Sequence, residues 1–296
     1  MLLIRRAEET LLNLFSQGLV SGTTHTSIGQ ESCSVGVAAA LDLEKDIVFS
    51  NHRCHGHFLA YGAPVDLLFA EVMGKRSGAC AGIGGSQHLH YRNFYSNGIQ
   101  GGIVPGATGM ALAEKLKGLG TITVVFLGDG TFGEGVIYEC FNIASLWRLP
   151  MLFVVEHNGI SQSTPTHAGL AGNLAERPRA FGIETEELEA EGPAAVRDAA
   201  ARLAAAVRRD SRPHCLFLRT FRLGPHSKGD DTRSKEELAL AAERDPLNRM
   251  LRLLPTDAID AARQKVDAHI LESLARTQAA DELRFDEFMA IAGRQS

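Results

Sequence analysis

Apolar residues recur along the chain in two patterns, short uninterrupted runs and longer stretches with helical spacing. Uninterrupted runs occupy residues 121–127 and 151–155, which is typical of buried strands. Between them, from about residue 134 to residue 147, apolar positions recur as on one face of a helix, and Pro150 follows as a residue that ends helices. This order predicts two parallel strands joined by a right-handed connection through a helix.

The same criteria predict the remaining elements. Further buried strands are expected over residues 46–50 and 213–220. Helical periodicity or composition predicts helices over residues 4–17, 34–41, 104–117 and 194–209, and charged helices from residue 235 onward. Glycine-dense residues 78–102 are expected to form a loop without a regular core element, and polar residues 161–178 an irregular, mobile loop. We therefore expect residues 1–296 to form one α/β domain, in which a mainly parallel sheet is flanked by helices.

Composition and charge narrow the class of protein. With 296 residues, of which 45% are hydrophobic, the chain can bury a large core. A formal net charge of −5 argues against nucleic-acid binding by the chain as a whole. No apolar run reaches membrane length, no signal peptide is recognisable, and the five cysteines form no CxxC pair. These features predict a cytoplasmic protein that binds neither membranes nor nucleic acids.

Polar residues follow the two central strands where a ligand is expected. Gly128, Asp129 and Gly130 come directly after the first run, and Asn158 comes shortly after the second. In parallel sheets, ligands bind beyond the carboxyl ends of the strands, so Asp129 and Asn158 should lie on one edge. Glycine amides and a helix N-terminus favour an anion, whereas carboxylate and amide oxygens suit Mg²⁺. The pattern predicts a Mg²⁺–diphosphate site, although a lone Gly-Asp-Gly after a strand is more often only a turn.

The spacing of these residues resembles the thiamine-diphosphate motif, in which Gly-Asp-Gly is followed about thirty residues later by Asn. The intervening FNIASLWRLP and the following STP resemble the alpha subunit of the first component of 2-oxo acid dehydrogenase complexes. That family includes pyruvate, branched-chain 2-oxo acid and acetoin dehydrogenases. The resemblance extends from about Arg5 to about Pro246 and is most specific between residues 80 and 165. It implies a thiamine-diphosphate-binding fold that carries the diphosphate half of an active site.

The resemblance also implies which residues hold the cofactor. Asp129 and Asn158 would be Mg²⁺ ligands, and the carbonyl of Ile160 a third ligand. Backbone atoms near Gly98 and Gln100 would hold the aminopyrimidine ring. The diphosphate would be bound by five residues, namely Arg53, His52, Gly128, Gly130 and Thr131. Of these, His52 stands where the family has an aromatic residue, usually Tyr.

Two histidines are the expected catalytic residues. His25 belongs to a segment that resembles the HxxxGQE pattern of the family, and it would face the substrate. His226 belongs to a His-Ser pair followed by acidic residues, and it would contact the diphosphate or the reaction intermediate. A histidine pKa near the working pH suits proton transfer. Without the resemblance, His25 could equally be a turn residue, and the cluster of His52, His55 and His57 could suggest zinc, although no second ligand cluster accompanies it.

The resemblance further implies an oxidoreductase that decarboxylates a 2-oxo acid and passes the acyl group to a lipoyl carrier. The chain is too short to hold the domain that activates the cofactor. A beta subunit is therefore the expected partner, in an α2β2 heterotetramer that acts with a lipoyl-bearing acyltransferase. Three departures from the family pattern, His157, Gly133-Glu134-Gly135 and Pro225, concern the substrate more than the cofactor. A thiamine-dependent carboligase, a split transketolase-like subunit and a non-catalytic subunit are therefore alternatives.

Overall fold

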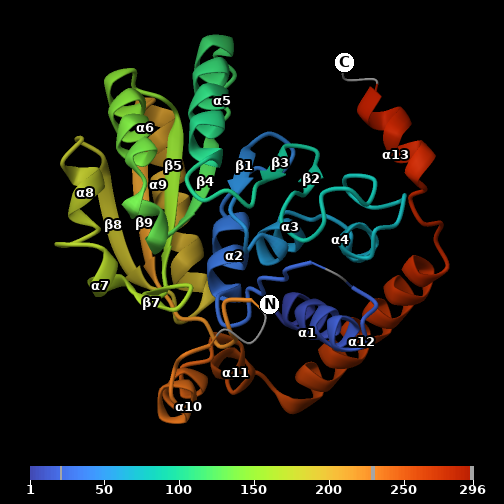
Figure 1. The fold of residues 1–296 in the computed structure, drawn as a ribbon. Coiled ribbons are helices and arrows are strands. Elements are labelled where there is room, and N and C mark those ends of the chain that lie inside the picture. The colour runs from blue at the N-terminus through green and yellow to red at the C-terminus, as the bar shows by residue number, and fades with distance from the viewer. Residues whose placement is uncertain (21, 228–230, 294–296) are drawn as a thin grey trace.

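The apolar runs form the centre of a seven-stranded sheet in a computed structural model of the chain, which describes residues 1–20, 22–227 and 231–293 (Figure 1). The strand order is β2–β3–β1–β4–β5–β9–β8, and every neighbouring pair is parallel except β2 and β3. The strands are β1 (Ile47–Ser50), β2 (His90–Tyr91), β3 (Phe94–Ser96), β4 (Thr123–Gly128), β5 (Met151–His157), β8 (Glu184–Glu189) and β9 (His214–Arg219). The prediction of a mainly parallel sheet is confirmed.

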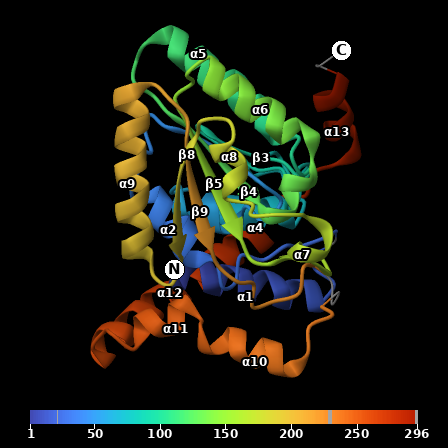
Figure 2. The same ribbon diagram turned by 90° about the vertical axis from the view of Figure 1, so that its left-hand side faces the viewer.

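Helices cover both faces of this sheet (Figure 2). One face packs against α1 (Leu2–Ser16), α2 (Glu31–Ala38), α3 (His55–Ala60), α4 (Val65–Val72) and α9 (Pro193–Asp210). The other face packs against α5 (Ile103–Lys117) and α6 (Gly135–Leu146). Alternate residues of β4 divide between the two cores: Val124 and Phe126 belong to the first, and Val125 and Leu127 to the second. The central strands β4 and β5 are apolar over most of their length because neither face meets water.

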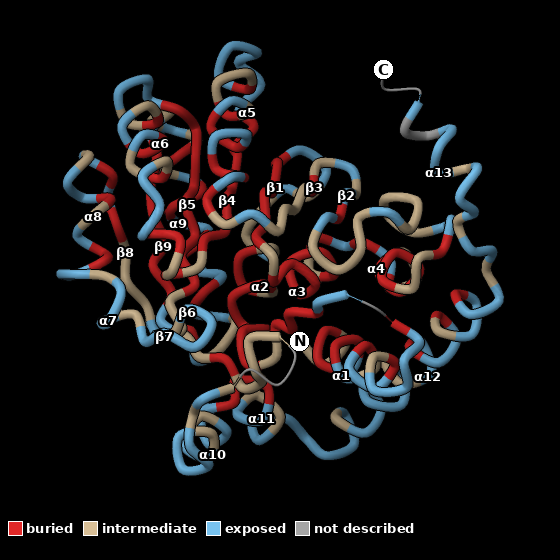
Figure 3. The backbone as a smooth tube through the Cα atoms, viewed as in Figure 1, coloured by how far each residue is buried: buried red, intermediate tan, exposed pale blue. Residues whose placement is uncertain are grey.

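The C-terminal helices lie outside these layers and are mostly exposed (Figure 3). They are α10 (Lys235–Glu243), α11 (Pro246–Leu251), α12 (Thr256–Gln278) and α13 (Phe285–Ala292). Helix α12 packs against α1 and α4. The buried side chain of Arg5 in α1 joins distant parts of the chain, because it donates to Glu31 at 2.5 Å and to Asp245 at 2.9 Å. Within the described residues, no helix is both long enough and apolar enough to cross a membrane.

Some sequence predictions of secondary structure are wrong in part. Residues 78–102 were expected to lack a core element, yet β3 pairs with β1 and its Phe94 is fully buried. The strand β8 has the sequence ETEELE and no apolar run, so its pattern gave no signal. It lies at the edge of the sheet, where Glu186 and Glu187 reach Arg202 and Arg219 at 2.6 and 2.7 Å.

The segment 161–178 is largely exposed, as expected, but it is not wholly irregular. It contains most of a small hairpin of β6 (Ile160–Ser161) and β7 (Thr164–Pro165), followed by the single turns α7 (Thr166–Gly169) and α8 (Glu176–Arg179). The turn α7 matters for the site, because its first residue contacts Asp129.

Candidate active site

The two central strands end side by side, as the sequence predicts. Gly128, the last residue of β4, is in register with Glu156 in β5. Asp129 therefore begins the 3₁₀ turn η1 (Asp129–Gly133) close to Asn158, which follows β5 directly. Helix α6 starts just after η1, so backbone N–H groups face the same edge of the sheet.

Asp129 is a buried carboxylate held by hydrogen bonds. Its Oδ2 accepts from Nδ1 of His157 at 2.8 Å, from the N–H of Gly159 at 2.9 Å and from the hydroxyl of Thr166 at 2.7 Å. Its Oδ1 accepts from the N–H of Gly130 at 2.9 Å. Burial acts to raise the pKa of Asp129, but the hydrogen bonds from His157 and Thr166 prevail and lower it. The carboxylate is therefore ionised at neutral pH and fixed in orientation.

The neighbouring turn supplies neutral oxygen atoms. Asn158 accepts a hydrogen bond from the N–H of Ile160 at 3.1 Å, and its amide nitrogen donates to Gln30 at 3.5 Å. Asn158 and Ile160 line the same cavity as Asp129. A carboxylate, an amide oxygen and a nearby carbonyl form a hard donor set of the kind Mg²⁺ prefers. The backbone of Gly130 packs directly against Ser161, because a Cβ at Gly130 would lie 2.2 Å from the hydroxyl oxygen of Ser161.

One cavity of about 280 Å³ collects the residues that the sequence proposes for the site. Those that line it are His25, His52, Arg53, Gly98, Gln100, Gly128, Asp129, Gly130, Asn158, Ile160 and His226. Thr131 is the exception. It is buried behind the cavity wall, and its hydroxyl donates to the side-chain oxygen of Gln100 at 3.3 Å.

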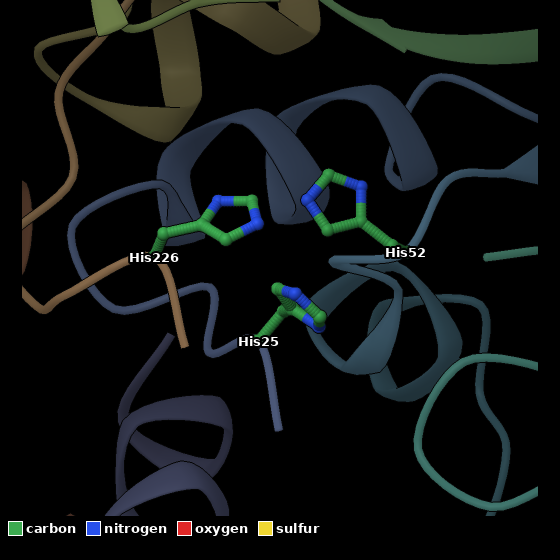
Figure 4. A group of neighbouring side chains, drawn as sticks. All are labelled: His25, His52 and His226. Atoms are coloured by element: carbon green, nitrogen blue, oxygen red, sulfur yellow. The ribbon is translucent and has the colours of Figure 1, made fainter. Parts of the chain in front are cut away.

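Three histidines from distant parts of the chain face one another in this cavity (Figure 4). The ring centroids of His25 and His52 are 4.6 Å apart, those of His25 and His226 also 4.6 Å, and those of His52 and His226 5.3 Å. One ring nitrogen of each histidine lies within 4.8 Å of those of the other two, which is close enough to consider a metal ion. The surroundings of the rings decide between a cation and an anion.

Those surroundings favour an anion. A guanidinium nitrogen of Arg53 lies 3.5 Å from Nδ1 of His226, and side-chain amide nitrogens of Gln87 and Gln100 contact Nδ1 of His25 and His52. These groups donate, so each neutral ring carries its proton on Nε2. Histidines that bind metals usually donate their second N–H to a carboxylate or carbonyl, which is the opposite arrangement. The buried Nε2 of His52 has no hydrogen-bond partner within the described residues.

The electrostatics of His52 agree with this arrangement. Burial lowers the pKa of His52 well below its usual value, and the neighbouring side chains of Arg53, His25, His226 and Arg222 lower it further. The ring is therefore neutral in the ligand-free chain. A diphosphate would relieve both the burial penalty and the repulsion, since it brings negative charge among these groups.

The histidines that follow His52 in sequence do not form a zinc site with it. His55 is fully buried and contacts Glu8 at 2.9 Å and the carbonyl of Ser86 at 3.0 Å. His57 contacts Ser50 at 2.8 Å and Glu156 at 3.1 Å. The helix α3 directs these two rings into the core in different directions, and only His52, which precedes it, reaches the cavity.

Further residues line the cavity that the sequence did not assign to the site. They are Gln30, Asn51, Gln87, Glu134, Glu156, Ser161, Gln162 and Arg222. Two of them adjoin an assigned residue in the sequence, Asn51 beside His52 and Ser161 beside Ile160. Gln87 and Glu156 had no such signal, because a glycine-rich loop and a buried strand bring them to the site.

The segment after β9 carries His226, and hydrogen bonds from two arginines hold this segment in place. Arg222 is fully buried and donates to the carbonyl of Gly224 at 3.0 Å. Arg233 donates to Asp231 at 2.8 Å and to the carbonyl of Gly224 at 2.7 Å. Lys228, Gly229 and Asp230 of this segment lie outside the described residues.

Comparisons with known proteins agree with the motifs. Residues 1–282 match a family described as "Dehydrogenase E1 component". The alpha subunit of the pyruvate dehydrogenase E1 component from Zymomonas mobilis is 36% identical over 289 residues, which cover 95% of this chain and 81% of that protein. The corresponding subunit from Rickettsia felis is 38% identical over 256 residues, covering 83% and 77%. The alpha subunit of acetoin:2,6-dichlorophenolindophenol oxidoreductase from Bacillus subtilis is 36% identical over 234 residues, covering 78% and 70%.

Proposed function

Because the chain belongs to the family of dehydrogenase E1 components, we propose that it is the alpha subunit of a 2-oxo acid dehydrogenase component and binds Mg²⁺–thiamine diphosphate in this cavity. The family in general depends on thiamine diphosphate. The observation that carries the proposal for this chain is that one cavity is lined by two chemically different sets of groups. Oxygen donors at the ends of β4 and β5 suit a metal ion, and the facing histidines and Arg53 suit an anion.

Each group then has a defined task. Asp129, Asn158 and the carbonyl of Ile160 hold Mg²⁺. The diphosphate is held by Gly128, Gly130, Arg53 and His52, and Thr131 supports the side chain of Gln100 from behind the cavity wall. Gly98 and Gln100 hold the pyrimidine end. The bound cofactor supplies the electron sink that allows a 2-oxo acid to lose carbon dioxide.

His25 and His226 are the proposed acid–base residues. Their rings contact each other, and side-chain nitrogens of Gln87 and Arg53 lie at their Nδ1 atoms, so Nε2 is the nitrogen that carries the proton of each neutral ring. Positioned histidines can protonate a developing oxyanion during decarboxylation and during transfer of the acyl group.

The site is completed by a partner. A beta subunit would supply the acidic residue that activates the cofactor, in a cytoplasmic α2β2 assembly. A lipoyl-bearing acyltransferase would accept the acyl group. Without the beta subunit, we expect the purified chain to release no carbon dioxide from a 2-oxo acid, and robust turnover by the chain alone would contradict a shared site.

The decisive assay offers the assembly of alpha and beta subunits a 2-oxo acid, together with either a lipoyl domain or an acceptor aldehyde. Pyruvate and branched-chain 2-oxo acids are tested separately. Acylated lipoyl domain supports the dehydrogenase function. Formation of acyloin alone, with no acylated lipoyl domain from any 2-oxo acid, would overturn it in favour of a carboligase.

A second substrate follows from the Bacillus subtilis relative, which is as similar to this chain as the relative from Zymomonas mobilis, at 36% identity. That relative is named for the oxidation of acetoin. The same assembly should therefore also be given acetoin with 2,6-dichlorophenolindophenol as electron acceptor. Bleaching of the dye with acetoin, and none with pyruvate, would assign acetoin as the substrate.

A further inference from the structure

A buried carboxylate in α4 organises the glycine-rich loop. The side chain of Glu71 is only 1% exposed. Its Oε2 accepts from the N–H groups of Cys80 at 2.6 Å and Gly82 at 2.9 Å, and its Oε1 accepts from Gly84 at 2.6 Å and Gly85 at 3.1 Å. These four N–H groups are termed the carboxylate nest. They occupy about as many lone-pair positions as an ionised carboxylate offers.

The backbone of the loop has the shape that such a nest requires. Gly82 and Gly85 have φ of 78° and 60°, and Ala81 has φ of 58°. Left-handed residues among right-handed ones turn successive N–H groups toward one point, as phosphate-binding loops do. Here the anion is part of the chain itself. In the described part of the chain, Glu71 forms no ion pair with a basic side chain, so backbone N–H groups alone neutralise it.

The loop leads directly into the wall of the proposed cofactor site. Ser86 contacts Nε2 of His55 through its hydroxyl at 2.9 Å. Gln87 follows, and its amide nitrogen lies 3.3 Å from Nδ1 of His25. The same side chain packs against Gly98, where a Cβ would lie 2.1 Å from the Gln87 side-chain oxygen. Displacement of the loop would therefore move a group that touches both His25 and the proposed pyrimidine-binding segment.

We propose that Glu71 is a positioning residue for the cofactor site: through the carboxylate nest it holds Gln87 against His25 and Gly98. This inference rests on the proposed function, because it assigns Gly98 to the pyrimidine end of thiamine diphosphate. The loop has little apolar packing of its own, since Ile83 is 44% exposed. Its order depends on charge-assisted hydrogen bonds, which are stronger than neutral ones.

The test uses Glu71→Gln, which keeps the shape of the side chain but replaces one acceptor oxygen with an N–H₂ group that faces N–H donors. Glu114→Gln in α5 is the matched control, because Glu114 is also buried on a helix but pairs with Lys117 at 2.6 Å, away from the loop. Binding of Mg²⁺–thiamine diphosphate and of Mg²⁺–pyrophosphate to the alpha–beta assembly is measured by calorimetry. Pyrophosphate probes the diphosphate end only.

In Glu71→Gln, we expect affinity for thiamine diphosphate to fall about 10-fold or more, which corresponds to the loss of one buried hydrogen bond or more. Affinity for pyrophosphate should stay within about 2-fold of wild type, since the carboxylate of Asp129, the proposed Mg²⁺ ligand, is held by His157, Gly159 and Thr166 and not by the loop. Hydrogen exchange should report lost protection at residues 80–85 in the variant. Equal weakening for both ligands, or no weakening for either, would overturn the proposal. Failure of the wild-type assembly to bind thiamine diphosphate would instead overturn the proposed function.

Chemical rescue gives an independent result if Glu71→Gln proves unstable. Glu71→Ala removes the carboxylate and leaves space beside the nest. Acetate, which presents the same two oxygens, should restore affinity for thiamine diphosphate in that variant, whereas chloride at equal ionic strength should not. No restoration by acetate in a folded Glu71→Ala assembly would count against the nest as the cause.

Discussion

A guanidinium nitrogen of Arg53 lies 3.5 Å from Nδ1 of His226, although the two residues are 173 positions apart in the sequence. A guanidinium group only donates hydrogen bonds, so Nδ1 of His226 must accept and the neutral ring carries its proton on Nε2. The contact therefore fixes which nitrogen is acidic. It also joins the loop after β1 to the segment after β9, both of which line the cavity.

The first prediction concerns Asp129. Asp129→Asn removes the charged ligand and places an N–H₂ group among donors, so we expect Mg²⁺-dependent binding of thiamine diphosphate to weaken about 100-fold or more. Calorimetry on the alpha–beta assembly measures this change. Asp198→Asn is the control, because Asp198 is exposed and pairs only with its neighbour Arg197. Unchanged affinity in Asp129→Asn would remove the proposed metal site.

The second prediction concerns the pH dependence of anion binding at His52. Burial, together with Arg53 and the other histidines, holds the pKa of His52 well below its usual value in the free chain, and a bound dianion raises it again. Binding is therefore accompanied by proton uptake between the two pKa values, and affinity falls as pH rises through the higher one. Acidic groups of the same cavity, Asp129, Glu134 and Glu156, moderate the size of this effect.

The measurement is calorimetry of Mg²⁺–pyrophosphate binding in two buffers with different enthalpies of ionisation, repeated across pH. We expect net proton uptake by the wild type and less uptake by His52→Gln. His269→Gln, on the exposed face of α12, serves as the control. Equal proton uptake by the wild type and His52→Gln would show that another group titrates.

The third prediction concerns His226. His226→Ala should reduce acylation of a lipoyl domain by about 10²–10⁴-fold, the usual cost of losing a positioned acid or base. The thermal midpoint should change little, because His226 lies on a loop and not in either apolar core. Single-turnover acylation by the alpha–beta assembly measures the rate. Wild-type rates in the variant would exclude His226 from the chemical step.

The fourth prediction concerns stability at Arg5. Arg5→Met leaves Glu31 and Asp245 buried without their cation, so we expect the free energy of unfolding to fall by about 3–5 kcal/mol. Arg6→Met is a control on the same helix, since Arg6 pairs with Glu9 and Asp267 on the exposed surface. It should cost less than about 1 kcal/mol. Denaturant unfolding of the full chain compares the two variants, and similar losses would contradict a special role for Arg5.

The sequence predicts the central part of the fold well for a physical reason. The strands β4 and β5 are covered on both faces, so their apolar residues form continuous runs that can be recognised in the sequence. The placement of Asp129 and Asn158 follows from these strands, because parallel strands end at one edge. An edge strand such as β8 needs little apolar surface and can be charged, and β3 is too short for a pattern to emerge.

The parts of the site that were not predicted depend on contacts between distant residues. Gln87 contacts His25 at the end of a loop whose N–H groups are bound by Glu71 from a different helix. The glycine density of residues 78–102 indicates a tight loop, but it does not show that this loop surrounds the carboxylate of Glu71. Likewise, the three histidines can be proposed one by one from motifs, but their mutual distances and the donors at Nδ1 require the folded chain.

The two ion pairs of Arg5 form at different stages of synthesis, because their acidic partners lie far apart in the sequence. A ribosome makes the chain from α1 onward at about 5–20 residues per second. Glu31 emerges soon after Arg5, but Asp245 follows only after every strand of the sheet, so α1 gains its second anchor late. His226 also arrives only after β9. A growing chain thus contains Asp129 and Asn158, the proposed metal ligands, well before His226, and capture of the proposed cofactor should await nearly complete translation.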